Sequence, residues 1–174
     1  MDLTDRIQQN TSAFLTDCMI GNLNEEQANR IRSMNRIAHE LENLGDGCKK
    51  ITYWLEKRAS KKLEFHKSGI EELADYNSQV LDFLKYNDDH LNNRMTEFSL
   101  EHAKEMEKRL NRQRNDLKKI VRKRLISGDD VRAEMIFLDI VRHLEQMGDS
   151  CFNISEEITA MDQFGKQPAA QDEA

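Results

Sequence analysis

The sequence has little of what turns, sheets and membrane spans require. Its 174 residues include one proline, seven glycines and 6% aromatic residues. Strands depend on β-branched and aromatic residues with turn residues between them, so this composition argues against a β-sandwich or a βαβ fold. The sequence also contains no run of about 18 apolar residues, and it lacks the basic start and apolar core of a signal peptide. What remains is an all-α protein, and its length suits one domain of roughly 100–200 residues.

Cysteine is too scarce for a disulfide framework. Cys18, Cys48 and Cys151 show no C-x-x-C spacing and lie within helical patterns. This placement is typical of small buried hydrophobic residues in a reducing compartment. The formal net charge of −6 argues against nucleic acid as the main partner. We therefore expect a cytoplasmic protein.

A few helix-breaking segments divide the sequence into five helical stretches. Asn24 can cap the second stretch, with Gln27 completing a capping box, and Gly128 can close the fourth in the left-handed conformation. The last residues have no periodicity and are expected to form a disordered tail. The predicted helices extend to about residue 20 and then cover about 25–59, 67–86, 91–126 and 130–161, and the tail covers 163–174.

Apolar residues recur along these stretches at steps of three and four, which is the pattern of helices in a bundle. The short polar connections imply that successive helices run antiparallel. In the second helix the predicted seam comprises Ile31, Met34, Ala38, Leu41, Gly45, Cys48 and Leu55. In the third helix it comprises Ile70, Leu73, Val80, Leu81 and Leu84.

An internal repeat links the second and fifth helices. A shift of 103 positions places residues 37–51 on residues 140–154, and both read Ile-x-x-x-Leu-Glu-x-x-Gly-Asp-x-Cys-x-x-Ile. These seven identities indicate a duplicated helical unit. Glycine inside a helix costs roughly 1 kcal/mol relative to alanine, so its repetition suggests that another backbone or an ion approaches closely there.

Each copy of the repeat carries two carboxylates four residues apart. Glu42 and Asp46 share one helix face, and so do Glu145 and Asp149. Carboxylates without a histidine or thiol partner suit hard cations such as Mg²⁺, Mn²⁺ or iron. The alternative is that each pair is solvated or bonds to arginine.

The Leu-Glu-x-x-Gly-Asp segments resemble those of the PhoU family, whose members consist of two three-helix repeats. The resemblance implies an antiparallel bundle with an incomplete first repeat over residues 1–62 and a second over 63–162. Five helices are predicted where the family has six, so the missing first helix is expected to precede residue 1. Leu23 to Gln27 also resembles the cytoplasmic domain at the carboxyl end of bacterial sodium/phosphate cotransporters.

The resemblance implies that Glu42, Asp46, Glu145 and Asp149 bind a divalent or iron metal ion. Lys50 lies four residues beyond Asp46 and can neutralise the first pair, so the second pair is the preferred site. Glu71 and Asp75 repeat the spacing on the third helix. They could complete the second site from a neighbouring helix, as could Glu107.

No catalytic constellation accompanies these carboxylates. A di-iron bundle needs Glu-x-x-His, and none of the five histidines has a glutamate three residues before it. The sequence also lacks a phosphate-binding loop, a nucleophile elbow and zinc-ligand spacing. We therefore expect a regulatory or interaction domain and no enzyme.

The resemblance implies regulation of phosphate transport at the cytoplasmic face of the inner membrane. The expected partner is a membrane-embedded sodium-dependent phosphate transporter, as part of the same chain. Three alternatives stay open: a free-standing PhoU-type regulator of phosphate signalling, a metal-binding helical bundle, and a helical scaffold that only forms a homodimer.

The fourth helix is strongly basic. From Lys104 to Arg124 the sequence has ten Lys or Arg and three acidic residues, a local formal charge of +7 that leaves −13 elsewhere. One explanation is a solvated helix face balanced by acidic neighbours. The other is a surface for anionic lipid headgroups or an acidic partner. No aromatic residues alternate with the bases, which again argues against nucleic acid.

Overall fold

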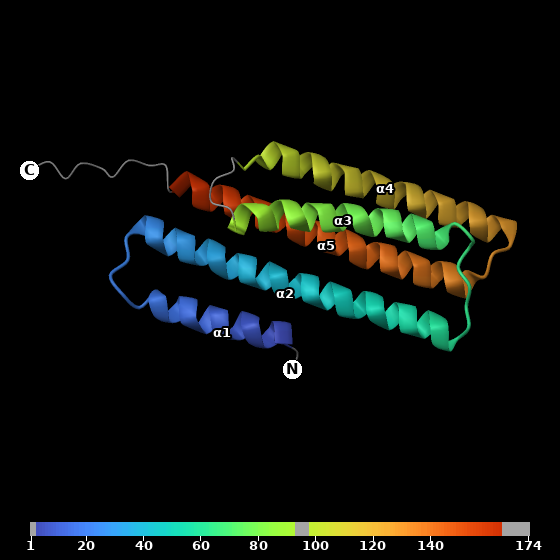
Figure 1. Cartoon of the computed structure of the whole chain (residues 1–174), viewed down its shortest axis with the longest axis horizontal. Helices are drawn as coiled ribbons and strands as arrows, with labels where there is room; N and C mark the ends of the chain where they lie inside the picture. Colours follow the sequence, from blue (N-terminus) through green and yellow to red (C-terminus); the bar gives the residue numbers. More distant parts are fainter. Residues whose placement is uncertain (1–2, 93–97, 165–174) are drawn as a thin grey trace, which may run out of the picture.

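The computed structural model describes residues 3–92 and 98–164, and these form helices with no strand. The prediction of an all-α bundle is therefore confirmed. Successive helices run antiparallel (Figure 1). The five helices are α1 (Leu3–Cys18), α2 (Glu25–Ser60), α3 (Gly69–Asn92), α4 (Leu100–Ser127) and α5 (Val131–Phe164).

Local chemistry sets several helix ends as predicted. The Asn24 side chain accepts from the Gln27 backbone N–H while the Gln27 side chain accepts from the Asn24 N–H, completing the capping box at α2. Gly128 ends α4 with φ of 99°. The expected start of the fourth helix at about residue 91 was wrong, because α3 continues to Asn92 and α4 begins after the Ser99 cap.

The structure describes only the first two residues of the predicted tail. Residues 163 and 164 belong to α5, and residues 165–174 lie outside the described residues. The prediction of disorder for those last residues is therefore not tested.

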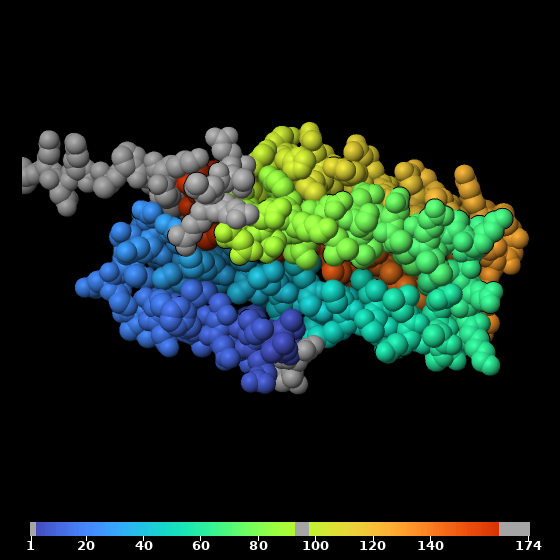
Figure 2. All heavy atoms as spheres, viewed as in Figure 1, coloured from blue at the N-terminus to red at the C-terminus, as the bar shows by residue number. Residues whose placement is uncertain are grey.

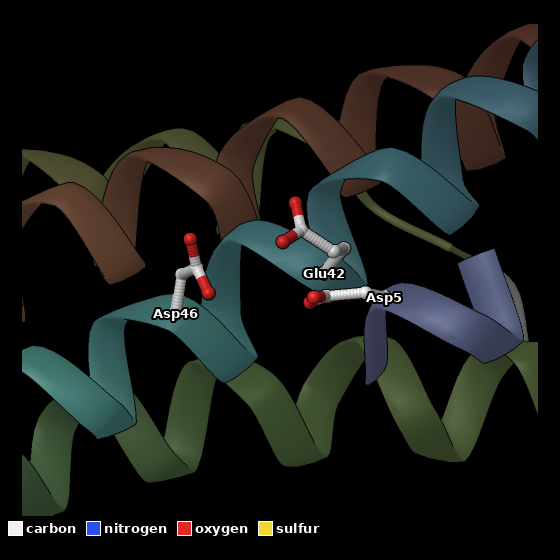
Figure 3. Close-up of side chains that lie close together, drawn as sticks. All are labelled: Asp5, Glu42 and Asp46. Carbon is white, nitrogen blue, oxygen red and sulfur yellow. The ribbon is translucent and has the colours of Figure 1, made fainter. Parts of the chain in front are cut away.

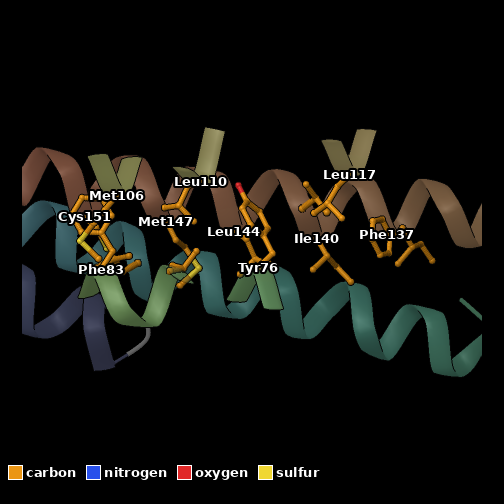
Figure 4. Close-up of a cluster of buried hydrophobic side chains, with 14 of the residues drawn as sticks. Tyr76, Phe83, Met106, Leu110, Leu117, Phe137, Ile140, Leu144, Met147 and Cys151 are labelled. Atoms are coloured by element: carbon orange, nitrogen blue, oxygen red, sulfur yellow. The ribbon is translucent and has the colours of Figure 1, made fainter. Parts of the chain in front are cut away.

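Helix α5 is the centre of the bundle. It packs against α2, α3 and α4, whereas α1 packs only against α2 within the described residues. In the space-filling view only small parts of α5 show between α2 and α3 (Figure 2). Its buried side chains meet those of α3 and α4 in one core that includes Tyr76, Phe83, Leu110, Phe137 and Leu144 (Figure 4). Burial of each large side chain contributes about 1.5–3 kcal/mol, so the packing around α5 contributes substantially to the stability of the fold.

The predicted seam of α2 was on the wrong face. Met34, Leu41, Cys48 and Leu55 are exposed, and the buried residues of α2 are instead Ser33, Ile37, Leu44 and Gly47. The small residues explain the difference, because they allow α5 to approach. A Cβ on Gly47 would lie 2.6 Å from Cγ of Met147. Met34, Ala38 and Leu41 of the predicted seam line a groove with residues of α1. Helix α1 is shorter than α2 and covers only part of it (Figure 1).

The predicted seam of α3 was also partly wrong. Ile70 and Leu81 are exposed, and Val80 packs in the core together with Tyr76 and Phe83. A buried asparagine, Asn87, continues this face toward α5. Its amide donates to the Cys151 carbonyl (2.7 Å), and its carbonyl oxygen accepts from the hydroxyl of the buried Ser155 (2.8 Å). A polar residue with both groups bonded can therefore occupy a core position.

The cysteines differ from one another in burial. Cys151 is buried as predicted, and burial raises the pKa of its thiol to about 12. Cys48 is exposed and Cys18 is half-buried, so the prediction of three buried cysteines was wrong for Cys48. It occupies the face of α2 that α5 does not cover.

A cluster of charged side chains is buried where α3, α4 and α5 meet. Nη2 of Arg124 donates to both carboxylate oxygens of Glu72 (2.5 and 2.6 Å) and to Oγ of Ser68 (2.8 Å). Its Nη1 lies 3.7 Å from Oε2 of Glu134. Arg124 is 6% exposed and Glu134 is 1% exposed. Burial raises the pKa of Glu134, and the nearby Arg124 opposes that rise. Arg124 is therefore an internal ion-pair partner, and its assignment to an exposed basic stripe was wrong.

Candidate functional site

The two copies of the repeat lie midway along α2 and α5, which pack antiparallel. Glu40 of the first copy accepts a hydrogen bond from the amide of Asn153 in the second (3.0 Å). The repeated glycines mark close approaches of a neighbouring helix. A Cβ on Gly45 would lie 2.9 Å from a methyl group of Thr4 in α1, and a Cβ on Gly148 would lie 2.6 Å from Cδ1 of Leu110 in α4. What approaches each glycine is therefore a side chain of the adjacent helix.

The first carboxylate pair gains a third member from α1. Glu42 and Asp46 lie on one face of α2, and the Asp5 carboxylate points toward the same region (Figure 3). One oxygen from each lies within 4.8 Å of the others, and no other set of three potential metal ligands meets this criterion among residues 3–92 and 98–164. Nζ of Lys49 lies 2.7 Å from Oδ1 of Asp46 and 3.5 Å from Oδ1 of Asp5. The cation at this pair is therefore the ammonium of Lys49, whereas the sequence had pointed to Lys50.

The second pair has an arginine at the corresponding place. Glu145 accepts a hydrogen bond from Nη1 of Arg114 in α4. Asp149 is exposed as a residue, but its carboxyl group is partly desolvated where α5 meets its neighbours. This partial burial raises the pKa of Asp149 to about 6, the negative charges of Glu145 and Glu107 add to the rise, and Arg114 opposes it. The buried hydroxyl of Tyr76 has no hydrogen-bond partner among the described residues. Burial, and next the charge of Glu145, raises the pKa of that hydroxyl.

Of the residues expected to complete the second site, only Glu107 is shown to interact with it. The negative charge of Glu107 raises the pKa of Asp149. The Glu107 carboxylate also accepts a hydrogen bond from the side-chain amide of Asn111 (3.1 Å). Glu71 and Asp75 are exposed on α3, and the described residues show no set of metal ligands that joins them to Asp149. Tyr76 is the residue of α3 that lies near this pair.

The two pairs differ in how firmly the protein holds its own cation. Arg114 reaches Glu145 from another helix, and its side chain is only 23% exposed. Lys49 comes from the same helix as Asp46, and its side chain is 42% exposed. A flexible ammonium can leave to the solvent more easily than a guanidinium held between helices. Once Lys49 has left, one oxygen each from Asp5, Glu42 and Asp46 can bind a hard cation. The structure therefore favours the first pair over the second as a metal site. Metal binding at either pair stays a prediction.

Sequence reasoning missed Asp5, Lys49, Arg114 and Tyr76. Nothing in the sequence fixes the rotation of α1 against α2, so the approach of Asp5 carried no signal. Arg114 was counted within a charged segment, where its partner on another helix could not be read. Only Lys49 had a local signal, since it lies three residues after Asp46 on the same helix.

One comparison with known proteins covers the second of these pairs. No described helix combines the length and hydrophobicity needed to cross a bilayer. Neither a curated protein nor a solved structure matches the sequence. The region from α3 to α5 that contains Glu145 and Asp149 does match a family model, and over residues 73–158 that model is the PhoU domain.

Proposed function

We propose that this chain is a PhoU-like regulatory domain that controls phosphate transport by binding a membrane-embedded phosphate transporter. The observation that carries the proposal is the PhoU match over residues 73–158. The second Glu-x-x-x-Asp segment lies inside this match, and its first copy lies opposite on α2. In this proposal the domain turns over no substrate and lies at the cytoplasmic face of the inner membrane.

Support for a sodium-dependent transporter comes from the resemblance of Leu23 to Gln27 to the cotransporter domains. In the tethered form of the proposal, transporter and domain are one chain. Fractionation of cells that make the natural protein separates this form from a free-standing regulator. A tethered domain stays with membranes after a wash at high salt, whereas a free-standing regulator is recovered in the supernatant.

Phosphate uptake tests the regulatory role directly. Cells lacking the gene should take up phosphate at a rate that no longer follows the phosphate supply, and the wild-type gene should restore the response. Glu145→Gln should restore it poorly because it weakens the contact with Arg114 between α4 and α5. Asp17→Asn, at an exposed position on α1, is the matched control. Uptake that follows the supply equally well without the gene would contradict the proposal.

A second candidate function is the binding of a divalent cation at Asp5, Glu42 and Asp46. The close approach of their three carboxylates favours it, and a hard ion such as Mn²⁺ suits these oxygen ligands. Isothermal titration with Mn²⁺ tests this site. Lys49→Gln should tighten binding because it removes the competing ammonium, whereas Lys50→Gln should not.

Titration of two further variants shows which pair holds the ion. Asp46→Asn should abolish binding at the first pair, and Asp149→Asn should not. The reverse result would place the ion at the second pair, as the sequence alone suggested. Heat changes that are the same for wild type and both variants would exclude both pairs.

A further inference from the structure

The outer face of α4 carries four exposed cations near its end. They are Lys118, Lys119, Arg122 and Lys123, and we call them the α4 basic face. At about 100° per residue these four positions lie within an arc of about 140°. Ile126, which is 82% exposed, falls in the middle of the same arc. Ile126 thus follows the α4 basic face by one helical turn, on the same side of α4.

Further exposed apolar side chains begin five residues after Ile126, at the start of α5. On α5, Val131 is 60% exposed and Met135 is 45% exposed, and they share a helix face with Leu138. Single exposed apolar residues are ordinary, but a contiguous group marks an interaction surface. A groove of about 480 Å³ lies between the two helices and is lined by Lys118, Val121, Arg122, Leu125, Ile126 and Leu138.

Nearby acidic residues leave most of the α4 basic face uncompensated. Asp130 bonds to Arg132 at 3.0 Å, and Asp139 bonds to Arg142 at 3.0 Å. Asp116 lies 2.9 Å from Lys119, but both side chains are largely exposed, so that pair is weak. No acidic residue occurs between Asp116 and Ile126, and Asp129 in the connection to α5 is half-buried. The net charge here is therefore positive in a chain whose overall formal charge is −6.

We propose that this end of the bundle docks onto an anionic lipid bilayer. The α4 basic face lies against the headgroups, and Ile126 and Val131 enter the interface. Ile126 lies near the end of α4 and Val131 begins α5, so both lie at the end of the bundle where α4 connects to α5 (Figure 1). Three of the four cations are lysines, whose compact charges on flexible stems suit a diffuse layer of headgroups better than one fixed protein partner. The proposal rests on the proposed function only in placing the domain beside a membrane.

Vesicle co-sedimentation tests the proposal without any transporter. Wild-type protein should bind phosphatidylcholine vesicles that contain about one third phosphatidylglycerol, and should not bind pure phosphatidylcholine. Binding should fall steeply with salt, because the screening length shortens from about 10 Å at 0.1 M to about 3 Å at 1 M. Inorganic phosphate at matched ionic strength should reduce binding no more than chloride does.

Variants at exposed positions assign the binding to this face. Each basic residue near such a surface contributes about fivefold, so Arg122→Gln with Lys123→Gln should lower the partition coefficient about 25-fold. Arg6→Gln with Lys85→Gln removes the same charge from exposed positions on α1 and α3 and should lower it less than about twofold. Ile126→Ser should cost about tenfold through lost apolar burial. Thermal unfolding of all variants should be unchanged because the side chains are exposed.

Three outcomes would overturn the proposal: no binding to either vesicle, equal binding to both, or equal losses in the two double variants. The first would leave an acidic protein as the occupant of the face. If the vesicles bind as expected while phosphate uptake proves independent of the gene, the docking surface stands and the proposed function fails.

Discussion

Replacing Arg124 by methionine should destabilise the protein strongly. Methionine keeps a long side chain against Phe137 but removes the guanidinium that bonds to Glu72 and faces Glu134. The side chain of Glu72 is 21% exposed and can turn toward water, whereas Glu134 is almost completely buried. The substitution therefore leaves at least one buried carboxylate without its cation.

Breaking a buried ion pair in this way costs about 3–5 kcal/mol. For a chain of this length each kcal/mol lowers the melting temperature by about 2–4 °C, so Arg124→Met should lower it by about 6–20 °C. Urea unfolding followed by circular dichroism measures the same loss as a lower midpoint at unchanged slope. Arg122→Met is the matched control, because Arg122 is exposed and its loss should change stability by less than about 0.5 kcal/mol.

The pH dependence identifies the cause of that loss. Glu134 has a raised pKa in the folded protein, so its protonated form favours the fold. This contribution is complete below the unfolded pKa of about 4.3 and disappears as the pH rises through the folded pKa. The penalty of Arg124→Met should therefore shrink on acidification, and Glu134→Gln should rescue the variant at neutral pH. A melting temperature for Arg124→Met within about 2 °C of that for Arg122→Met would refute the reasoning.

Three further predictions follow from other parts of the structure. Treatment with EDTA should leave helicity and melting temperature unchanged because apolar packing around α5 closes the core; unfolding on chelation would indicate a metal-organised fold. Asp149→Asn should stabilise the protein by about 1 kcal/mol at pH 7.5. The wild-type carboxyl group contributes fully below about pH 3.8 and loses its contribution as the pH rises through about 6, so the gain should vanish in acid melts. Gly148→Val should lower stability by about 1–3 kcal/mol because its side chain meets Leu110, whereas Gly21→Ala, at an exposed position, should not.

The sequence predicts those features of this fold that depend on neighbours along the chain. Asn24 and Gln27 bond to each other across three residues, and Gly128 needs only its own backbone freedom, so both helix ends were readable. Rotation of a helix about its axis depends on what packs against it. Apolar spacing on α2 pointed to the face of Met34, but the small residues Ser33 and Gly47 admit α5 more closely.

The carboxylate pairs were readable for the same reason, and their surroundings were not. Glu145 and Asp149 share a helix face because they are four residues apart. Arg114 and Tyr76 reach them from α4 and α3, at sequence distances that no local rule connects. Charge counting placed Arg124 on the surface with its neighbours, although its carboxylate partners lie on α3 and α5.

The central position of α5 has a consequence for how the protein is made. Helices α2, α3 and α4 leave the ribosome before the helix that joins them, because α5 begins only at Val131. Synthesis of α5 takes several seconds at about 5–20 residues per second. During that time the apolar faces of the α1–α2 pair and the α3–α4 pair stay exposed. Nascent chains that stall before α5 should therefore depend on chaperones. Chains from which α5 has emerged should lose this dependence.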